Sequence, residues 1–221
     1  MTPGALAVGI GFAALGAAAE RLATVWPQDE ASHRSPGART VLLALAAGLA
    51  GGAVTWRANL PPLVLAVHLV ILGILVLLTA TDLEQRRLPH LLLDPLIVVA
   101  IAFVPFNPAV SWQDALIGGG AAVAFLGLLG LLVRGGVARG DLLLIAPLGL
   151  IVGWPAIFIA MFLAGLLSAV VSVGLLATGR AGLQSYIPFG PFLVAGLVIT
   201  LLREPGLLGP IASLMSTFVR T

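Results

Sequence analysis

The chain has 221 residues, of which 60% are hydrophobic and only 9% are charged, and its mean hydropathy is +1.14. These values lie far from the balance of a water-soluble domain and indicate an integral membrane protein. The formal charge is only +2 and no basic patch is interleaved with aromatic residues, so the sequence does not indicate a nucleic-acid partner. The absence of cysteine excludes disulfides and thiolate metal sites.

The apolar runs are about as long as a bilayer is thick, which takes roughly 20 helical residues. We therefore predict an all-α, multi-pass membrane protein, because helices satisfy their own backbone groups in lipid. The first run lacks a basic leader and is expected to be a retained span. About eight spans are predicted, at residues 4–25, 40–58, 62–82, 91–105, 113–133, 141–153, 155–178 and 188–203. The last stretch, 205–221, is predicted either as a ninth short span or as an interfacial segment.

The longest polar segment, WPQDEASHRSPGART at 26–40, has the Pro, Ser and Gly content of a solvated loop. We therefore expect one transmembrane domain over residues 1–221, with one short loop in water. All basic residues are arginines, and with the N-terminus outside most of them lie at the same side of the membrane. The positive-inside rule places the connections at 26–40, 83–90, 134–140 and 179–187 in the cytoplasm.

Two acids stand out because each borders a long apolar run. Asp82 ends the run LVILGILVLLTATD, and Asp141 begins the run DLLLIAPLGLIV. Carboxylates in or next to the membrane are costly and indicate function, although Asp141 could also cap its helix. Capping explains Asp82 less well, because an acid at a helix C-terminus opposes the helix dipole.

Simpler explanations are available for the other acids near apolar runs. Asp114 is expected to cap the fifth span, and Asp94, which precedes Pro95, is expected to be the N-cap of a helix. Glu20 adjoins Arg21 at the inner end of the first span, where we expect a paired interfacial charge.

Two carboxylates on separate helices can hydrolyse a peptide bond without a metal or a nucleophilic side chain. Like charges at short range cannot both ionise, so such a pair shares one proton. The ionised partner then accepts a proton from water, while the protonated partner polarises the scissile carbonyl. If Asp82 and Asp141 form this pair, their carboxylates should lie on the order of 3 to 7 Å apart, with room for one bridging water.

Three segments carry motifs that resemble a known family, and they occur in the family's order. In ATDLEQRRLPHLLLDPL, an Asp is followed by a short polar loop, Leu-Pro and a new helix. In ARGDLLLIAPLGLIVGW, a Gly-Asp pair precedes Leu-Gly and a later Gly-Trp. The segment YIPFGPFLVAG is similar to a Pro-Phe-Gly-Pro-Phe stretch that opens a last helix. Together they resemble the type IV prepilin leader peptidases.

The resemblance implies a membrane aspartyl endopeptidase that removes the basic leader from prepilin or pseudopilin precursors at the cytoplasmic face of the inner membrane. It implies catalytic roles for Asp82 and Asp141, without a metal or another cofactor. Residues that would bind the substrate or shape the site are Gly140, His90, Pro188, Gly190 and Pro191. Two plainer alternatives stay open, since His90 could be a solvated loop residue and Pro188 to Pro191 a simple helix start.

The chain also departs from the family's pattern. Leu143 stands where the family carries a lysine two residues after the second Asp, and Ala138 replaces a glycine. Bifunctional members carry two Cys-x-x-Cys pairs in the first cytoplasmic loop, with spacing suited to a structural zinc. Because this chain has no cysteine, we expect a compact peptidase without N-methyltransferase activity.

Three other classes of protein remain open at this level. A proton-coupled transporter would also keep paired carboxylates, but nearer the bilayer midplane. A presenilin-like intramembrane protease would share the Gly-Asp feature, although its companion acid usually follows a tyrosine and Asp82 follows Thr81. An inactive scaffold for pilus assembly is the third alternative.

Overall fold

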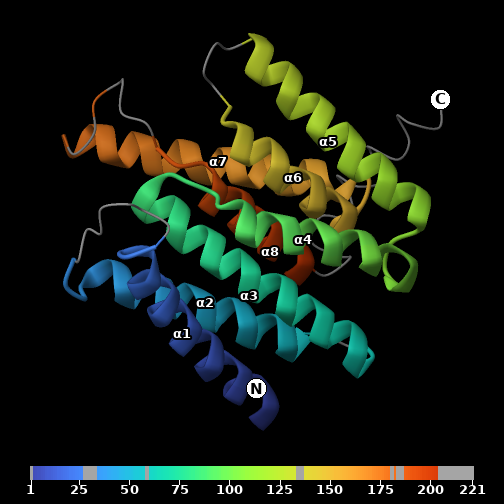
Figure 1. The fold of residues 1–221 in the computed structure, drawn as a ribbon, viewed down its shortest axis with the longest axis horizontal. Coiled ribbons are helices and arrows are strands. Elements are labelled where there is room, and N and C mark those ends of the chain that lie inside the picture. Colours follow the sequence, from blue (N-terminus) through green and yellow to red (C-terminus); the bar gives the residue numbers. More distant parts are fainter. Residues whose placement is uncertain are drawn as a thin grey trace. The chain divides into compact units, whose positions relative to one another are not determined.

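The computed structural model describes residues 2–26, 34–57, 60–132, 137–179, 182 and 187–203. Its described residues form eight α-helices and one short 3-10 helix and contain no strand, which confirms the all-α prediction. The elements are α1 (Pro3–Ala23), α2 (Ala38–Arg57), α3 (Pro62–Gln85), α4 (His90–Phe103), η1 (Val104–Phe106), α5 (Trp112–Leu132), α6 (Arg139–Val152), α7 (Ala156–Ala177) and α8 (Gly190–Leu202) (Figure 1). The stretch 205–221, predicted as a ninth span or an interfacial segment, lies outside the described residues.

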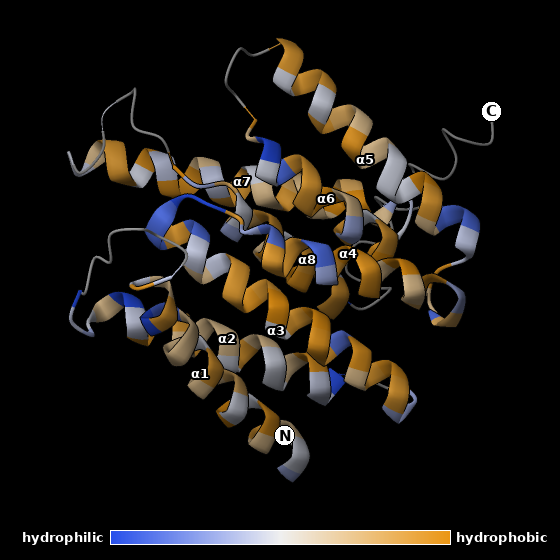
Figure 2. Ribbon diagram, in the orientation of Figure 1, coloured by the Kyte–Doolittle hydropathy of each residue, from blue (hydrophilic) through white to orange (hydrophobic). Residues whose placement is uncertain are grey.

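The lengths and compositions of the helices fit a bilayer. Five of them, α1, α2, α3, α5 and α7, are long and apolar enough to cross a membrane, and α4 with η1 and α8 are shorter apolar helices. Apolar residues cover most of the length of α3, and hydrophilic ones gather at its C-terminal end (Figure 2). Large apolar side chains are also exposed, among them Leu49, Leu63 and Leu131. Such exposure is typical of surfaces that face lipid.

Local signals explain several helix starts. Thr2 caps α1 through its hydroxyl, which accepts a hydrogen bond from the Ala5 backbone N–H at 3.3 Å, and Pro3 follows as the first helical residue. At α5, Ser111 Oγ accepts from the Asp114 N–H at 3.1 Å and donates to Asp114 Oδ2 at 2.6 Å. Ser111 therefore caps this helix, and Asp114, which was expected to be the cap, lies in the first turn, where its charge complements the helix dipole.

The chain divides into two compact units, residues 1–106 (unit 1) and residues 107–221 (unit 2). In unit 1, α1 packs along α2 and α3, and α3 packs against α4. In unit 2, α5 packs on α6, and α8 packs on both α7 and α6. The expectation of a single domain over 1–221 stays a prediction.

Within each unit, small residues let helix backbones approach closely. A Cβ placed on Gly16 of α1 would lie 2.7 Å from the Leu43 carbonyl oxygen of α2. One placed on Gly149 of α6 would lie 2.6 Å from Gly119 Cα of α5. In lipid the hydrophobic effect does not drive helices together, because lipid tails are as apolar as the helix surfaces. Helices there associate through close van der Waals packing, which small residues allow.

Candidate active site

Asp82 lies in the last turn of α3. The helix continues to Gln85, one turn past the predicted end of the span, so Asp82 sits inside the helix rather than at its terminus. Its backbone carbonyl accepts a hydrogen bond from the N–H of Arg86 at 2.9 Å, and Arg86 ends the helix in the left-handed conformation, with φ at 54°. The residue is only 5% exposed, and its neighbour Thr81 is buried as well. A buried carboxylate near a helix end therefore exists where the motif predicts the first catalytic acid.

Asp141 is the third residue of α6. The helix begins at Arg139 and its N-cap is Ala138, whose side chain makes no capping hydrogen bond. Asp141 is 4% exposed and makes no ion pair with a described residue. An acid at this position can reach back toward the N–H of the N-cap residue, so helix stabilisation accounts for part of its placement.

The two acids belong to different units, Asp82 to unit 1 and Asp141 to unit 2. The separation of their carboxylates, expected to be on the order of 3 to 7 Å, stays a prediction. Gly140, directly before Asp141, is half-buried in the first turn of α6. Leu143, at the position of the family's lysine, is 37% exposed and offers no charge to either acid.

The segment with Pro188, Gly190 and Pro191 forms the start of α8. Gly190 is the first helical residue and is buried, Pro191 occupies the first turn, and Phe189 is the N-cap. Proline suits this position because its missing N–H would have no partner there. The geometry fits an ordinary helix start, and a role for these residues in shaping the site stays a prediction.

His90 is the first residue of α4, and its ring is largely exposed. Its Nδ1 lies 3.3 Å from Asp94 Oδ1, one turn further along the same helix. The prediction that Asp94 is an N-cap is wrong: the cap is Pro89, and Pro95 lies inside α4. The earlier Leu-Pro pair sets the helix boundary, and the second proline is accommodated within the first two turns.

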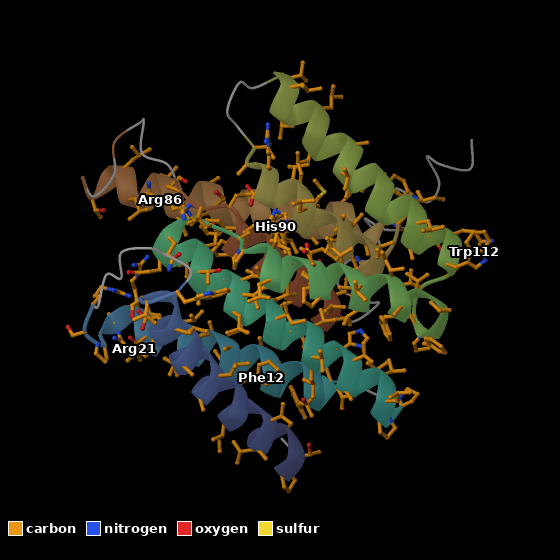
Figure 3. All side chains as sticks on the ribbon, viewed as in Figure 1. Phe12, Arg21, Arg86, His90 and Trp112 are labelled. Carbon is orange, nitrogen blue, oxygen red and sulfur yellow. The ribbon has the colours of Figure 1, made fainter. Side chains whose placement is uncertain are left out.

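A polar cluster at the C-terminal end of α3 was missed by sequence reasoning, and we call it the ionic cluster. Its members are Glu20 of α1, Arg34, Arg39 of α2 and Glu84 of α3. The expected ion pair between Glu20 and Arg21 is present at 3.8 Å, but Glu20 also pairs more closely with Arg34. Arg21 lies at the end of α1 and Arg86 directly follows α3 (Figure 3). The only sequence signal was Glu20 itself, an acid at the end of an apolar run.

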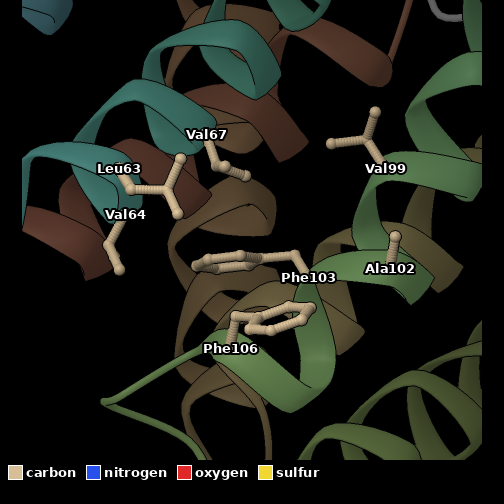
Figure 4. Close-up of a pocket in the computed structure, with 7 residues that line it drawn as sticks. All are labelled: Leu63, Val64, Val67, Val99, Ala102, Phe103 and Phe106. Carbon is tan, nitrogen blue, oxygen red and sulfur yellow. The ribbon is translucent and has the colours of Figure 1, made fainter.

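The described part of unit 1 also holds an apolar cavity of about 230 Å³ between α3 and the segment formed by α4 and η1. It is lined by Leu63, Val64, Val67, Val99, Ala102, Phe103 and Phe106 (Figure 4). No lining residue is titratable, so the cavity offers no acid or base for catalysis. Among the described residues, no three His, Asp or Glu side chains gather in a way that could hold a metal ion.

The fold and these residues define a class: a multi-pass α-helical membrane protein with buried acids near helix ends. The family model of the type IV leader peptidase family matches residues 69–173, which include both Asp82 and Asp141. Over this stretch, the chain is similar to that family.

Proteins of several bacteria are similar to the chain as well. A prepilin leader peptidase/N-methyltransferase of Burkholderia pseudomallei (strain 1026b) is 36% identical over 177 residues, which are 76% of this chain and 56% of the relative. A protein with the same name in Stutzerimonas stutzeri is 33% identical, over 74% of this chain and 58% of the relative. Another in Bacillus subtilis (strain 168) is 29% identical, over 60% of this chain and 54% of the relative. The chain thus spans about half the length of the curated relatives it matches. No solved structure matches the chain.

Proposed function

We propose that this chain is a membrane aspartyl endopeptidase that removes the basic leader from prepilin-like precursors at the cytoplasmic face of the inner membrane. The observation that carries the proposal is the burial of Asp82 and Asp141, each at the position its motif predicts. The third acid buried in the described part of the chain is Glu20, which pairs with Arg34 and the Thr40 hydroxyl and lies outside the three motifs. The two motif aspartates are therefore the candidates for chemistry.

In the proposed reaction, the two aspartates share one proton. The ionised carboxylate takes a proton from a water molecule, whose oxygen attacks the scissile carbonyl carbon, while the protonated carboxyl donates a hydrogen bond to the carbonyl oxygen. Collapse of the tetrahedral intermediate breaks the C–N bond, and a carboxyl proton passes to the departing amine. The amine becomes the new N-terminus of the apolar helix, and the leader leaves with a carboxylate.

The positions of the acids favour this reaction over proton-coupled transport. Asp82 lies in the last turn of α3 and Asp141 in the first turn of α6, whereas transporter sites usually lie near the bilayer midplane. A substrate with a soluble basic leader and an apolar helix would be cut where these parts meet, at the membrane surface. The absence of cysteine further supports a peptidase that does not methylate the new amine.

Two conservative substitutions test the proposal. Asp82→Asn and Asp141→Asn remove an ionisable group and change the shape of the side chain little, so each should abolish processing while the protein still inserts in the membrane. The assay is co-expression with a precursor that carries a basic leader, a glycine before the cut and an apolar helix after it. Substantial cleavage by either variant would remove that aspartate from the mechanism.

A further inference from the structure

The ionic cluster joins the residues that directly follow Asp82 to α1, to α2 and to Arg34, which precedes α2. Arg39 donates from Nη1 to Glu84 Oε2 at 2.9 Å and from Nη2 to the Leu83 carbonyl at 2.5 Å. Arg34 Nη2 lies 3.2 Å from the same Glu84 oxygen. The last turn of α3 is therefore held by two guanidinium groups from outside the helix.

The other side of the cluster is fixed to α1. Arg34 pairs with Glu20 Oε1, and the Thr40 hydroxyl donates to Glu20 Oε2 at 2.8 Å. Arg21 of α1 donates to the Arg34 carbonyl at 2.5 Å. The Glu20 and Glu84 side chains are only 7% and 11% exposed, so water screens these pairs less than it would at an open surface.

Gln85 adds a third attachment of the same turn. Its side-chain amide nitrogen donates to the carbonyl of Ala23, the last residue of α1, at 2.5 Å and to the carbonyl of Trp26, just after the helix, at 2.8 Å. The last turn of α3 consists of Asp82 and the three residues that follow it. Each of these three, Leu83, Glu84 and Gln85, is bound to a group that is distant in sequence. Any tilt or unwinding of this turn would carry the Asp82 carboxyl with it.

We propose that the ionic cluster is a positioning device for Asp82, with Glu84 and Arg39 as its key positioning residues. The inference rests on the proposed function, since it assigns the cluster a role through the Asp82 carboxyl. Neither residue touches the substrate in this account. Their contribution is to hold the carboxyl in the orientation that proton transfer needs, and a misplacement of about 1 Å can cost on the order of 100-fold in rate.

The test compares Glu84→Gln, Arg39→Gln and Arg39→Lys with the parent enzyme in a membrane processing assay, with kcat and KM measured separately. Glu84→Gln and Arg39→Gln should each lower kcat by roughly 10- to 100-fold with KM nearly unchanged. Arg39→Lys should recover part of the loss, because it keeps the charge but loses one of the two hydrogen bonds. The loss in the double variant should be smaller than the product of the two single losses, because Glu84 and Arg39 share one contact, although each also binds a second group.

The chain offers a matched control at the other end of α2. Arg57→Gln removes an arginine from the last residue of the same helix, far along its length from Arg39, and should leave kcat and KM unchanged. Membrane abundance and thermal stability in detergent show whether a variant is folded. Arg39 is 46% exposed and should be the better tolerated of the two sites, which keeps the test informative if Glu84→Gln does not fold.

Asp82→Asn in the same assay separates the two claims. If Asp82→Asn is inactive while folded Glu84→Gln and Arg39→Gln keep the parental kcat, the positioning inference is wrong and the peptidase proposal stands. A change confined to KM would also overturn the inference, because it would place the cluster in substrate binding. If Asp82→Asn cleaves normally, the proposed function itself fails.

Discussion

The contact between α5 and α6 leaves no room for a side chain at Gly149. A Cβ there would lie 2.6 Å from Gly119 Cα and 2.7 Å from the Gly118 carbonyl oxygen, both of them backbone atoms that cannot rotate away. Ordinary contact begins at 3.4 Å, so Gly149→Ala requires the helices to separate locally by about 0.8 Å, the difference from 2.6 Å. Overpacking of this kind costs about 1 to 3 kcal/mol, or roughly a 5- to 150-fold change in the unfolding equilibrium.

Gly120→Ala is the matched control, because Gly120 directly follows Gly119 in α5 but is exposed, and nothing lies within 4 Å of its added Cβ. Alanine is also the better helix former by about 0.5 to 1 kcal/mol, so this variant should be neutral or slightly stabilised. The measurement is reversible unfolding in mixed detergent micelles, followed by helix content. Equal stability of Gly149→Ala and Gly120→Ala would refute the argument that this crossing sets the position of α6, the helix that carries Asp141.

Two further predictions concern the product and the membrane topology. The mature product released by this protein alone should carry a free N-terminal amine. Mass spectrometry of the product, made in a host without another such peptidase, checks this. An added methyl group would contradict the expected lack of methyltransferase activity. Since the chain has no cysteine, Ser35→Cys and Ser111→Cys give single labelling sites. An impermeant thiol reagent applied from outside should label Ser111→Cys and not Ser35→Cys, and the reverse pattern would invert the topology.

The helices were predictable because their lengths are set by the bilayer. Each apolar run of sufficient length became a helix, and the observed bounds differ from the predicted ones by a few residues. The extension of α3 past Asp82 was missed because Leu83, Glu84 and Gln85 are mostly polar and resemble a loop. Their contacts with α1, α2 and Arg34 hold this turn in helical form. Such contacts join residues that are far apart in the chain, so the local sequence does not reveal them.

The same limit explains what was missed at Glu20 and the error at Asp94. The predicted pair of Glu20 with Arg21 is present, but Arg34 and Thr40 reach Glu20 from another part of the chain and make the closer contacts. Asp94 with Pro95 has the composition of a helix start, but so does the preceding Leu-Pro pair, and local sequence alone does not decide between them. The two motif aspartates stand out in the sequence because their neighbours are apolar on one side and polar on the other, and their catalytic role stays a prediction.

A cross-linking measurement between positions 82 and 141 tests most directly the claim that the two aspartates form one site. Asp82→Cys/Asp141→Cys would introduce the only two thiols of the chain. Gly130→Cys/Val137→Cys is the positive control, since a Cβ at Gly130 lies 3.2 Å from Val137 Cβ. If the two aspartates form one site, a short bifunctional thiol reagent should bridge positions 82 and 141 in intact membranes. Failure to bridge this pair, under conditions in which the control pair is bridged and the protein is folded, would contradict a shared catalytic site.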